Sequence, residues 1–327
     1  MVSSAHWVPL VAFSTTLVLL WWLVRGRIVW KVLDHPNERS LHLHPVPRVG
    51  GIGLLAGISF AWTLLTPGTG MVVWVCLLLL CLVSCLDDAR GVSILLRLFV
   101  HLVAATAVSY QALWDTSAWW TTPIAALAIC WMINLYNFMD GSDGLAGGMA
   151  MFGFFAYGVA SWIAGNTGFA LLNFSICAAA MAFLIFNFHP AKVFLGDAGS
   201  IPLGYLAGAF GLTGYTKGYW SLWFPVLVFS PFVVDATLTL VRRLFCGHRI
   251  WHAHRDHYYQ RLVQLGWGHR NTALAEYLLM AICVVAGLVI LRFPSITLVV
   301  STLLLCSYAV LIIAISSAWS RARGAKP

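Results

Sequence analysis

Long apolar runs recur along the whole chain and constrain its fold more than any other feature of the sequence. Each approaches the roughly 20 residues that an α-helix needs to cross a bilayer. About eleven can be distinguished, near residues 7–24, 50–66, 71–86, 98–113, 120–138, 149–164, 169–187, 199–213, 219–240, 273–291 and 295–316. Only 9% of the residues are charged, against about 25% in soluble proteins. The sequence therefore predicts an all-α polytopic membrane protein with about eleven transmembrane helices.

The positive residues indicate how these helices are oriented. With eleven spans, the segments 25–49, 87–97, 139–148, 188–198 and 241–272 and the tail after 316 face one side. They hold all of the 19 Lys and Arg residues except Lys217 and Arg292. Because Lys and Arg concentrate in cytoplasmic loops, we expect the N-terminus outside and the C-terminus in the cytoplasm. The first run lacks a basic leader and a small-residue cleavage site, so it is expected to be a span and not a removed signal.

Two amides and two carboxylates follow the fifth apolar run, in the stretch Asn134-Leu-Tyr-Asn137-Phe-Met-Asp140-Gly-Ser-Asp143-Gly. The spacing of three residues places Asn134, Asn137 and Asp140 on one side of a helix. One interpretation is a polar helix end with a glycine cap. The other is a metal and phosphate site at the membrane surface, and it gains weight from the loops that share this face.

Three of those loops carry further polar groups. Arg39 and Arg48 could hold anions or simply touch anionic lipid. Asp87 and Asp88 end the third run, where two adjacent carboxylates need a metal or a basic partner such as Arg90 or Arg97. Asp197 follows Lys192 and stands between two glycines, as a metal ligand or as a helix N-cap.

The longest inner loop contains His252-Ala-His254-Arg255-Asp-His257. Zinc is one interpretation, although the segment offers no cysteine partner. A clamp for a pyrophosphate fits His and Arg side chains better, and a basic loop lying on lipid headgroups is the third. The carboxylates and the His/Arg cluster together favour a hard divalent cation, Mg²⁺ with Mn²⁺ as a substitute, beside a nucleotide-linked phosphate.

In this order the motifs resemble those of the polyprenyl-phosphate N-acetylhexosamine-1-phosphate transferases, from about Asp34 to Arg270. The matching segments are P-x-P-R-x-G-G at 45–51, Asp87-Asp88, N-x-x-N-x-x-D-G-x-D-G-L at 134–145, F-x-G-D-x-G-S at 194–200 and the His-rich loop. The resemblance implies a single integral membrane catalytic domain over residues 1–327. It also implies transfer of an amino-sugar 1-phosphate from a UDP-sugar to undecaprenyl phosphate, with release of UMP.

The resemblance also implies roles for individual residues. It makes Asp197 a magnesium ligand, with Asp88 a second candidate. It sets Asp87 and Asp88 beside the lipid phosphate, and Asp140 and Asp143 in the catalytic pocket. The substrate-binding residues would be Arg39, Arg48, Asn134, Asn137, Lys192, His252, His254, Arg255 and His257.

The departures from the family pattern are informative about the branch. The last loop lacks three consecutive histidines, and no lysine follows Asp88 closely. These differences favour enzymes that initiate O-antigen or related glycans, with UDP-GlcNAc, UDP-FucNAc or UDP-QuiNAc as donor.

The expected location is the bacterial inner membrane, with the site facing the cytoplasm. The expected partners are the two substrates, membrane lipids and a second copy in a homodimer. No nucleic acid is expected. The alternative function is a transporter or lipid flippase.

Overall fold

Helices make up almost the whole of the computed structural model, which describes residues 5–26, 33–34, 36, 41, 44–65, 70–115, 118–249 and 254–324. In chain order they are α1 (Val8–Arg25), α2 (Gly50–Thr63), α3 (Met71–Arg90), α4 (Ile94–Leu113), α5 (Thr121–Phe138), α6 (Leu145–Ile163), α7 (Thr167–Asn187), α8 (Asp197–Thr216), α9 (Trp223–Val228), α10 (Ser230–Phe245), α11 (Tyr258–Leu262), α12 (Gly268–Arg292) and α13 (Thr297–Gly324). Two short strands, β1 (Leu33–Asp34) and β2 (Val46–Pro47), pair antiparallel.

All the helices except α11 coincide with the eleven apolar runs, and α9 and α10 share one run. Seven helical segments of the described chain are long and apolar enough to cross a membrane: Val8–Arg25, Met71–Asp88, Ile94–Leu113, Leu145–Ile163, Thr167–Asn187, Tyr258–Arg292 and Pro294–Gly324. The helix α2 is apolar but shorter. The prediction of an all-α polytopic membrane protein is therefore confirmed, while the number of crossings and their orientation stay predictions.

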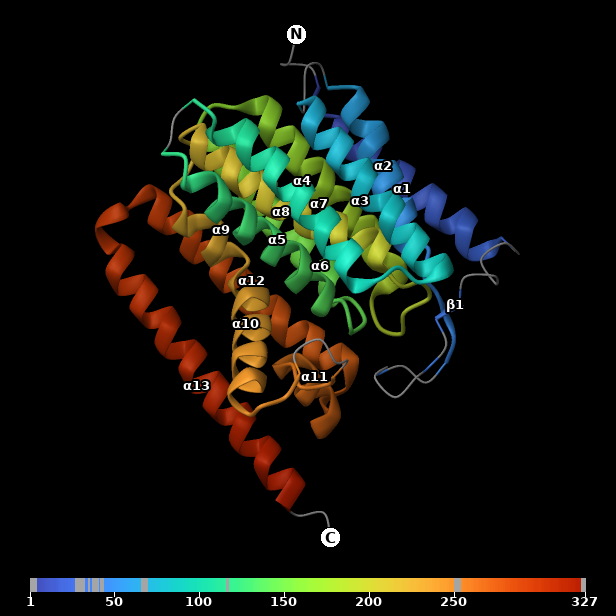
Figure 1. Ribbon diagram of the computed structural model, residues 1–327, viewed down its shortest axis with the longest axis vertical. Coiled ribbons are helices and arrows are strands. Elements are labelled where there is room, and N and C mark those ends of the chain that lie inside the picture. Colours follow the sequence, from blue (N-terminus) through green and yellow to red (C-terminus); the bar gives the residue numbers. More distant parts are fainter. Residues whose placement is uncertain are drawn as a thin grey trace.

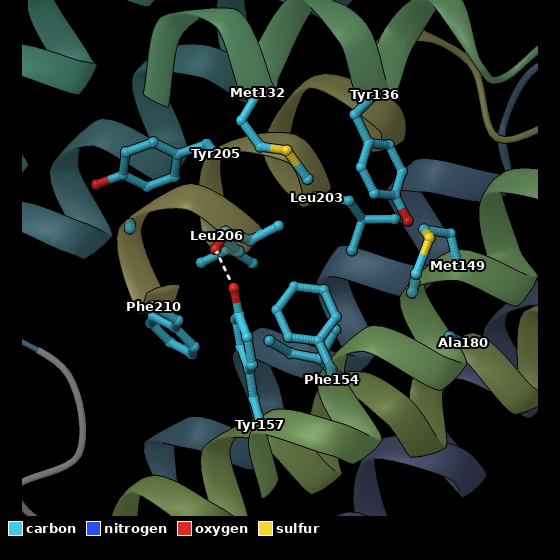
Figure 2. Close-up of a cluster of buried hydrophobic side chains, with 14 of the residues drawn as sticks. Met132, Tyr136, Met149, Phe154, Tyr157, Ala180, Leu203, Tyr205, Leu206 and Phe210 are labelled. Atoms are coloured by element: carbon cyan, nitrogen blue, oxygen red, sulfur yellow. Dashed lines mark hydrogen bonds between the residues drawn. The ribbon is translucent and has the colours of Figure 1, made fainter. Parts of the chain in front are cut away.

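Helices α1 to α8 form a bundle, with α10, α12 and α13 along one flank (Figure 1). Inside the bundle α6 packs along α7, and α5 packs against α8. Aromatic side chains fill the space between α5, α6 and α8, where Tyr157 donates a hydrogen bond to the carbonyl of Ala207 at 3.0 Å (Figure 2). These fully buried rings supply much of the apolar burial that holds the bundle together. The described part of α13 is peripheral, with only Leu304 and Tyr308 buried.

One apolar run is broken in the structure. The run at 219–240 divides into α9 and α10 at Phe229. Pro231 stands in the first turn of α10, where its missing N–H costs nothing but where it prevents continuation of the preceding helix. The break lets α10 take its own direction, which ends beside α11 (Figure 1).

Candidate active site

Backbone hydrogen bonds join the first and third polar loops. The amide of Phe194 donates to the carbonyl of Pro47 at 2.8 Å, and the amides of Gly50 and Gly51 donate to the carbonyls of Phe194 and Leu195, each at 2.9 Å. A β-carbon at Gly51 would lie 2.5 Å from the Cα of Gly199. Only glycine allows so close an approach of α2 to the start of α8. The two motifs are therefore parts of one structure, with Arg48 and Asp197 at its open edge.

Two arginines connect the acidic residues of these loops. Arg48 lies 2.7 Å from Asp34 and 3.8 Å from Asp88. Arg97, in the first turn of α4, forms an ion pair with Asp87 and lies 3.4 Å from Asp197. Asp87 also accepts a hydrogen bond from the amide of Val92 at 2.6 Å. Both oxygens of Asp87 are thus occupied, whereas Asp88 faces Gly196, at which a β-carbon would lie 3.8 Å from Oδ2 of Asp88.

The loop after α5 brings a third motif to the same place. Asn137 accepts a hydrogen bond from the hydroxyl of Ser200 at 2.7 Å, and its side chain lies near Asp197. Asp140 lies near the backbone of Gly196. Burial raises the pKa of Asp140 well above its ordinary value, and the charge of Asp197 raises this pKa further, while Arg48 opposes the shift. Asp88, Asp140 and Asp197 thus converge from the ends of α3, α5 and the start of α8.

The repulsion between these carboxylates is what a bound cation would relieve. Their oxygen donors suit Mg²⁺. Among the described residues no three His, Cys, Asp or Glu side chains already stand at metal-ligand spacing. The donor set therefore fits an ion held by one or two carboxylates together with water and substrate phosphates, which is the usual mode for Mg²⁺.

The capping alternatives for two motifs are not what is observed. The residue that caps α8 is Gly196, with φ of 69°, and Asp197 begins the helix itself. The C-cap residue of α5 is Met139. The glycine of the motif, Gly144, is instead the N-cap residue of α6, with φ of 77°. Asn187 accepts a hydrogen bond from the amide of Gly144 at 2.9 Å. This bond connects the loop before α6 to the end of α7.

Asp143 lies in a separate cluster of polar groups. It accepts from His189 at 2.7 Å and from the amide of Ala191 at 3.2 Å. The ring of His189 stacks on that of His269, which also contacts Ser142 at 2.8 Å. The carboxylate is buried and occupied, so its position suits holding the loop 188–196 in place.

Two predicted binding residues have contacts of other kinds. Asn134 donates to the carbonyl of Cys130 at 2.7 Å within its own helix. The side chain of Lys192 is exposed, while its amide donates to the carbonyl of Phe186 at 2.7 Å. Arg39 and His252 lie outside the described residues.

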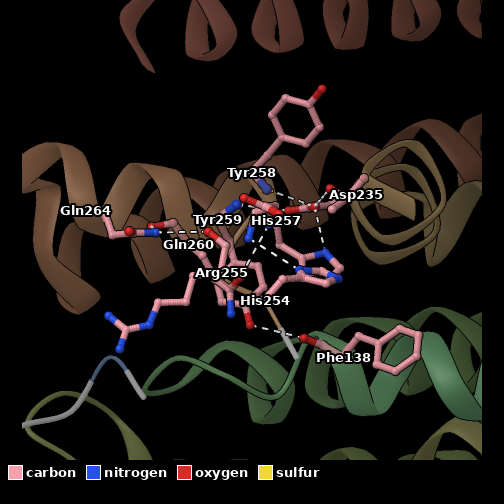
Figure 3. Close-up of polar contacts among 11 residues, drawn as sticks. Phe138, Asp235, His254, Arg255, His257, Tyr258, Tyr259, Gln260 and Gln264 are labelled. Carbon is pink, nitrogen blue, oxygen red and sulfur yellow. Dashed lines mark hydrogen bonds and ion pairs between the residues drawn. The ribbon is translucent and has the colours of Figure 1, made fainter. Parts of the chain in front are cut away.

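The His-rich loop packs on the loop that contains Asp140 (Figure 3). The hydroxyl of Tyr259 donates to the carbonyl of Phe138 at 3.1 Å, and the ring of His257 stacks on Phe138 with centroids 6.3 Å apart. His257 is only 3% exposed, whereas His254 and Arg255 are partly exposed. Burial lowers the pKa of His254 to about 4, with a contribution from the nearby His257 and Arg243. Its imidazole is therefore neutral at pH 7.

The sequence offered Arg97 as one possible basic partner of Asp87 and Asp88, and the Arg97–Asp87 ion pair is observed. It indicated no role for Asp235 or His189. Asp235 is 6% exposed and accepts hydrogen bonds from the start of α11. A carboxylate inside an apolar run was the available signal, since buried charge in such a segment is costly and is kept for a reason. No comparable signal existed for the contact of Arg97 with Asp197, which lies one hundred residues further along the chain.

The fold and the site define a polytopic membrane protein with a carboxylate-rich centre at one end of its helix bundle. Residues 70–215 match the family model described as glycosyl transferase family 4. A probable undecaprenyl-phosphate N-acetylglucosaminyl 1-phosphate transferase of Bacillus subtilis is 28% identical, over 86% of this chain and 83% of that protein. A decaprenyl-phosphate N-acetylglucosaminephosphotransferase of Mycolicibacterium smegmatis is 28% identical, over 84% and 79%.

An undecaprenyl-phosphate alpha-N-acetylglucosaminyl 1-phosphate transferase of Yersinia pestis is 27% identical, over 79% of this chain and 76% of that protein. Over residues 70–215 the chain is similar to glycosyl transferase family 4, and its relatives are named as polyprenyl-phosphate N-acetylglucosaminyl 1-phosphate transferases. By class it is a glycosyl-1-phosphate transferase. The family match spans α3 to α8, which contain Asp87, Asp88, Asp140, Asp143 and Asp197.

Proposed function

We propose that the protein transfers an N-acetylated amino-sugar 1-phosphate from a UDP-sugar to undecaprenyl phosphate, forming a lipid-linked pyrophosphate and UMP. The observation that carries the proposal is the convergence of Asp88, Asp140 and Asp197 with Arg48 and Arg97 from separate motifs. The names of the relatives support the same reaction class, since they join N-acetylglucosaminyl phosphate to a polyprenyl phosphate. The donor amino sugar is UDP-GlcNAc, UDP-FucNAc or UDP-QuiNAc, and the product initiates O-antigen or a related surface glycan.

In this reaction an oxygen of the acceptor phosphate attacks the phosphorus attached to the sugar. The new P–O bond forms as the bond to the UMP oxygen breaks, and UMP leaves with the electron pair. Two anions must approach each other, so the barrier is chiefly electrostatic. Mg²⁺, held by Asp197 with Asp88 or Asp140, would neutralise charge on the donor pyrophosphate.

The protein groups supply orientation and charge. Arg48 lies beside Asp88, at the proposed position of the acceptor phosphate. Asp88 orders that phosphate or takes its proton, while Asp87 holds Arg97 next to Asp197. His254 and Arg255 bind donor phosphates from the opposite loop. Because His254 is neutral, it acts as a hydrogen-bond donor and adds no charge of its own.

The expected setting is the bacterial inner membrane, with eleven crossings, the N-terminus outside and this site in the cytoplasm. An acceptor as apolar as undecaprenyl phosphate should enter laterally from the lipid along an apolar groove. A transporter or flippase is less well supported, because such a protein should present polar groups to both faces, whereas Asp88, Asp140 and Asp197 meet at one end of the bundle.

The decisive experiment is to incubate the purified protein with undecaprenyl phosphate, Mg²⁺ and a panel of UDP-amino sugars, and to identify the lipid product by mass. We expect a lipid pyrophosphate carrying one of the three amino sugars. Asp197→Asn should nearly abolish UMP release. Near-normal turnover of that variant would refute the metal assignment, and absence of any lipid product with the wild-type protein would refute the function.

A further inference from the structure

Asp235 accepts four hydrogen bonds from groups around it. It lies in α10 shortly after the break at Phe229, and it is 6% exposed. The amides of Tyr258 and Tyr259 donate to its two oxygens, each at 2.9 Å (Figure 3). The other two contacts come from Nδ1 of His257 at 3.2 Å and from the hydroxyl of Thr239 at 3.1 Å. A buried carboxylate with this many donors is well satisfied.

The two amides belong to the first turn of α11, whose N–H groups have no partner within that helix. The α11 helix continues into the π-helical turn Val263–Trp267, but no helix directly precedes it in the described part of the chain, so the donors of its first turn need partners from elsewhere in the chain. A carboxylate from α10 at the N-terminus of α11 satisfies two of these donors and interacts favourably with the helix dipole. Asp235 therefore supports α11 from outside its own segment of the chain.

The contact with His257 sets the state of the imidazole. An ionised carboxylate can only accept, so this contact requires a proton on Nδ1 of His257. The imidazole ring is thereby held in a stacked position on the ring of Phe138, with an interplanar angle of 30°. At 3% exposure His257 is better placed to hold the loop than to touch a substrate.

From α11 the contacts continue to the loop that contains Asp140. The hydroxyl of Tyr259 donates to the carbonyl of Phe138. It also fills the space above Gly141, where any β-carbon would collide with it. Gly141 directly follows Asp140. A shift of α11 would therefore displace the backbone one residue from the carboxylate cluster.

We propose that Asp235 is a positioning residue of the active site, acting through His257 and α11 on the loop 138–141. The inference rests on the proposed function, because it assigns Asp235 to the donor side of that transfer reaction. The proposal also makes His257 a partner of Asp235 at the start of α11, while His254 and Arg255 face the donor phosphates.

A double-mutant cycle tests the proposal. Asp235→Asn and His257→Gln should each lower kcat/KM for the UDP-sugar by about 10- to 100-fold, as loss of an orienting partner does at other sites. The kcat/KM of the double variant should be no lower than that of the poorer single variant, because both substitutions remove the same contact between Asp235 and His257. The KM for undecaprenyl phosphate should stay unchanged. Binding of UMP, measured by calorimetry, should weaken in both single variants.

Tyr259→Phe supplies a second route that leaves the buried carboxylate intact. It should reduce donor kcat/KM in the same direction as Asp235→Asn but to a smaller extent. Glu276→Gln is the matched control, since Glu276 lies on α12 close enough to influence Asp235 electrostatically. In the hydrogen bonds of the described residues it contacts neither His257 nor α11, so it should keep wild-type kinetics.

The outcomes separate the two levels of inference. A wild-type protein that makes no lipid product contradicts the proposed function itself. An active wild-type protein whose Asp235→Asn variant melts normally and keeps its donor kcat/KM contradicts the positioning role. Losses that multiply in the double variant would also contradict it, because they would mean that Asp235 and His257 act separately.

Discussion

At the scale of single residues, the site depends on how like charges are distributed around two arginines. Arg97 pairs with Asp87 and reaches Asp197, and Arg48 reaches Asp34 and Asp88. Each arginine therefore serves two carboxylates that come from different motifs. This sharing brings carboxylates of separate motifs together around the two arginines.

Arg97→Gln should reduce transfer strongly, because it removes the charge that orders Asp87 and Asp197 together. Hydrogen bonds to charged groups contribute about 1.5–3 kcal/mol, so a loss of roughly 10- to 100-fold in kcat is expected. Arg90→Gln is the control, since Arg90 is exposed at the end of α3. UMP release by both variants gives the comparison. Equal rates for Arg97→Gln and the wild type would remove Arg97 from the site.

Asp140 should make the protein less stable when no divalent cation is present. Its raised pKa means that folding favours the protonated form, so the stability it contributes at low pH is lost as pH rises through the folded-state pKa. At neutral pH in EDTA, Asp140→Asn should therefore melt above the wild type. Mg²⁺ should raise the Tm of the wild type more than that of the variant.

Thermal unfolding followed by tryptophan fluorescence measures both effects, and lowering the pH in EDTA should narrow the gap between the two proteins. An equal Mg²⁺ shift in both would show that the ion binds without Asp140.

At the scale of elements, polar loops become a site because helix ends are fastened together by backbone contacts. The segment 47–51 and the segment 194–199 share three backbone hydrogen bonds and a glycine–glycine contact between α2 and α8. The α11 helix is fastened to the loop 138–141 through Tyr259. Such contacts fix where the carboxylates stand, since their side chains are short.

Gly51→Ala should separate α2 from α8 and disturb Arg48 with it. Overpacking of this kind costs about 1–3 kcal/mol, which should appear as a lower Tm and a reduced transfer rate. Gly168→Ala in α7 is the matched control. A β-carbon there would meet only Asn166, at 3.7 Å, so the effect should stay within about 0.5 kcal/mol. Normal melting and activity of Gly51→Ala would show that the close contact is dispensable.

At the scale of the whole molecule, eleven helical segments follow the eleven apolar runs, although only seven reach the length and hydropathy of a typical span. The remaining ones include α5 and α8, which contain the polar residues of the site. The α8 helix is buried along most of its length, and a helix surrounded by other helices can be less apolar than one facing lipid, because it packs against protein.

The proposed orientation predicts which engineered thiols a membrane-impermeant maleimide reaches. In a background without the exposed Cys246 and Cys306, Lys217→Cys should be labelled in intact cells whose outer membrane is permeable. Arg249→Cys should be labelled only after the inner membrane is opened. Both positions are exposed, so accessibility within the protein does not distinguish them. The reverse pattern would invert the topology and place the site outside.

The sequence by itself determined the fold class, the helix positions and the acidic residues worth testing. Apolar periodicity and length require no knowledge of neighbours, because every backbone group of a spanning segment must be satisfied within its own helix. The local spacing of Asn134, Asn137 and Asp140 likewise needed only the helical repeat. The family followed from ordered motifs that are separated by long apolar stretches.

Only the tertiary structure decided how these residues are partnered. It set Asp143 against His189, gave Arg97 to Asp87 and Asp197, and joined Asp235 to the start of α11. These contacts cross about 10 to 100 residues of chain, and nothing local encodes them, since a carboxylate offers the same two oxygens to any donor. Which partner it takes depends on which helix ends the packing of the bundle brings within reach.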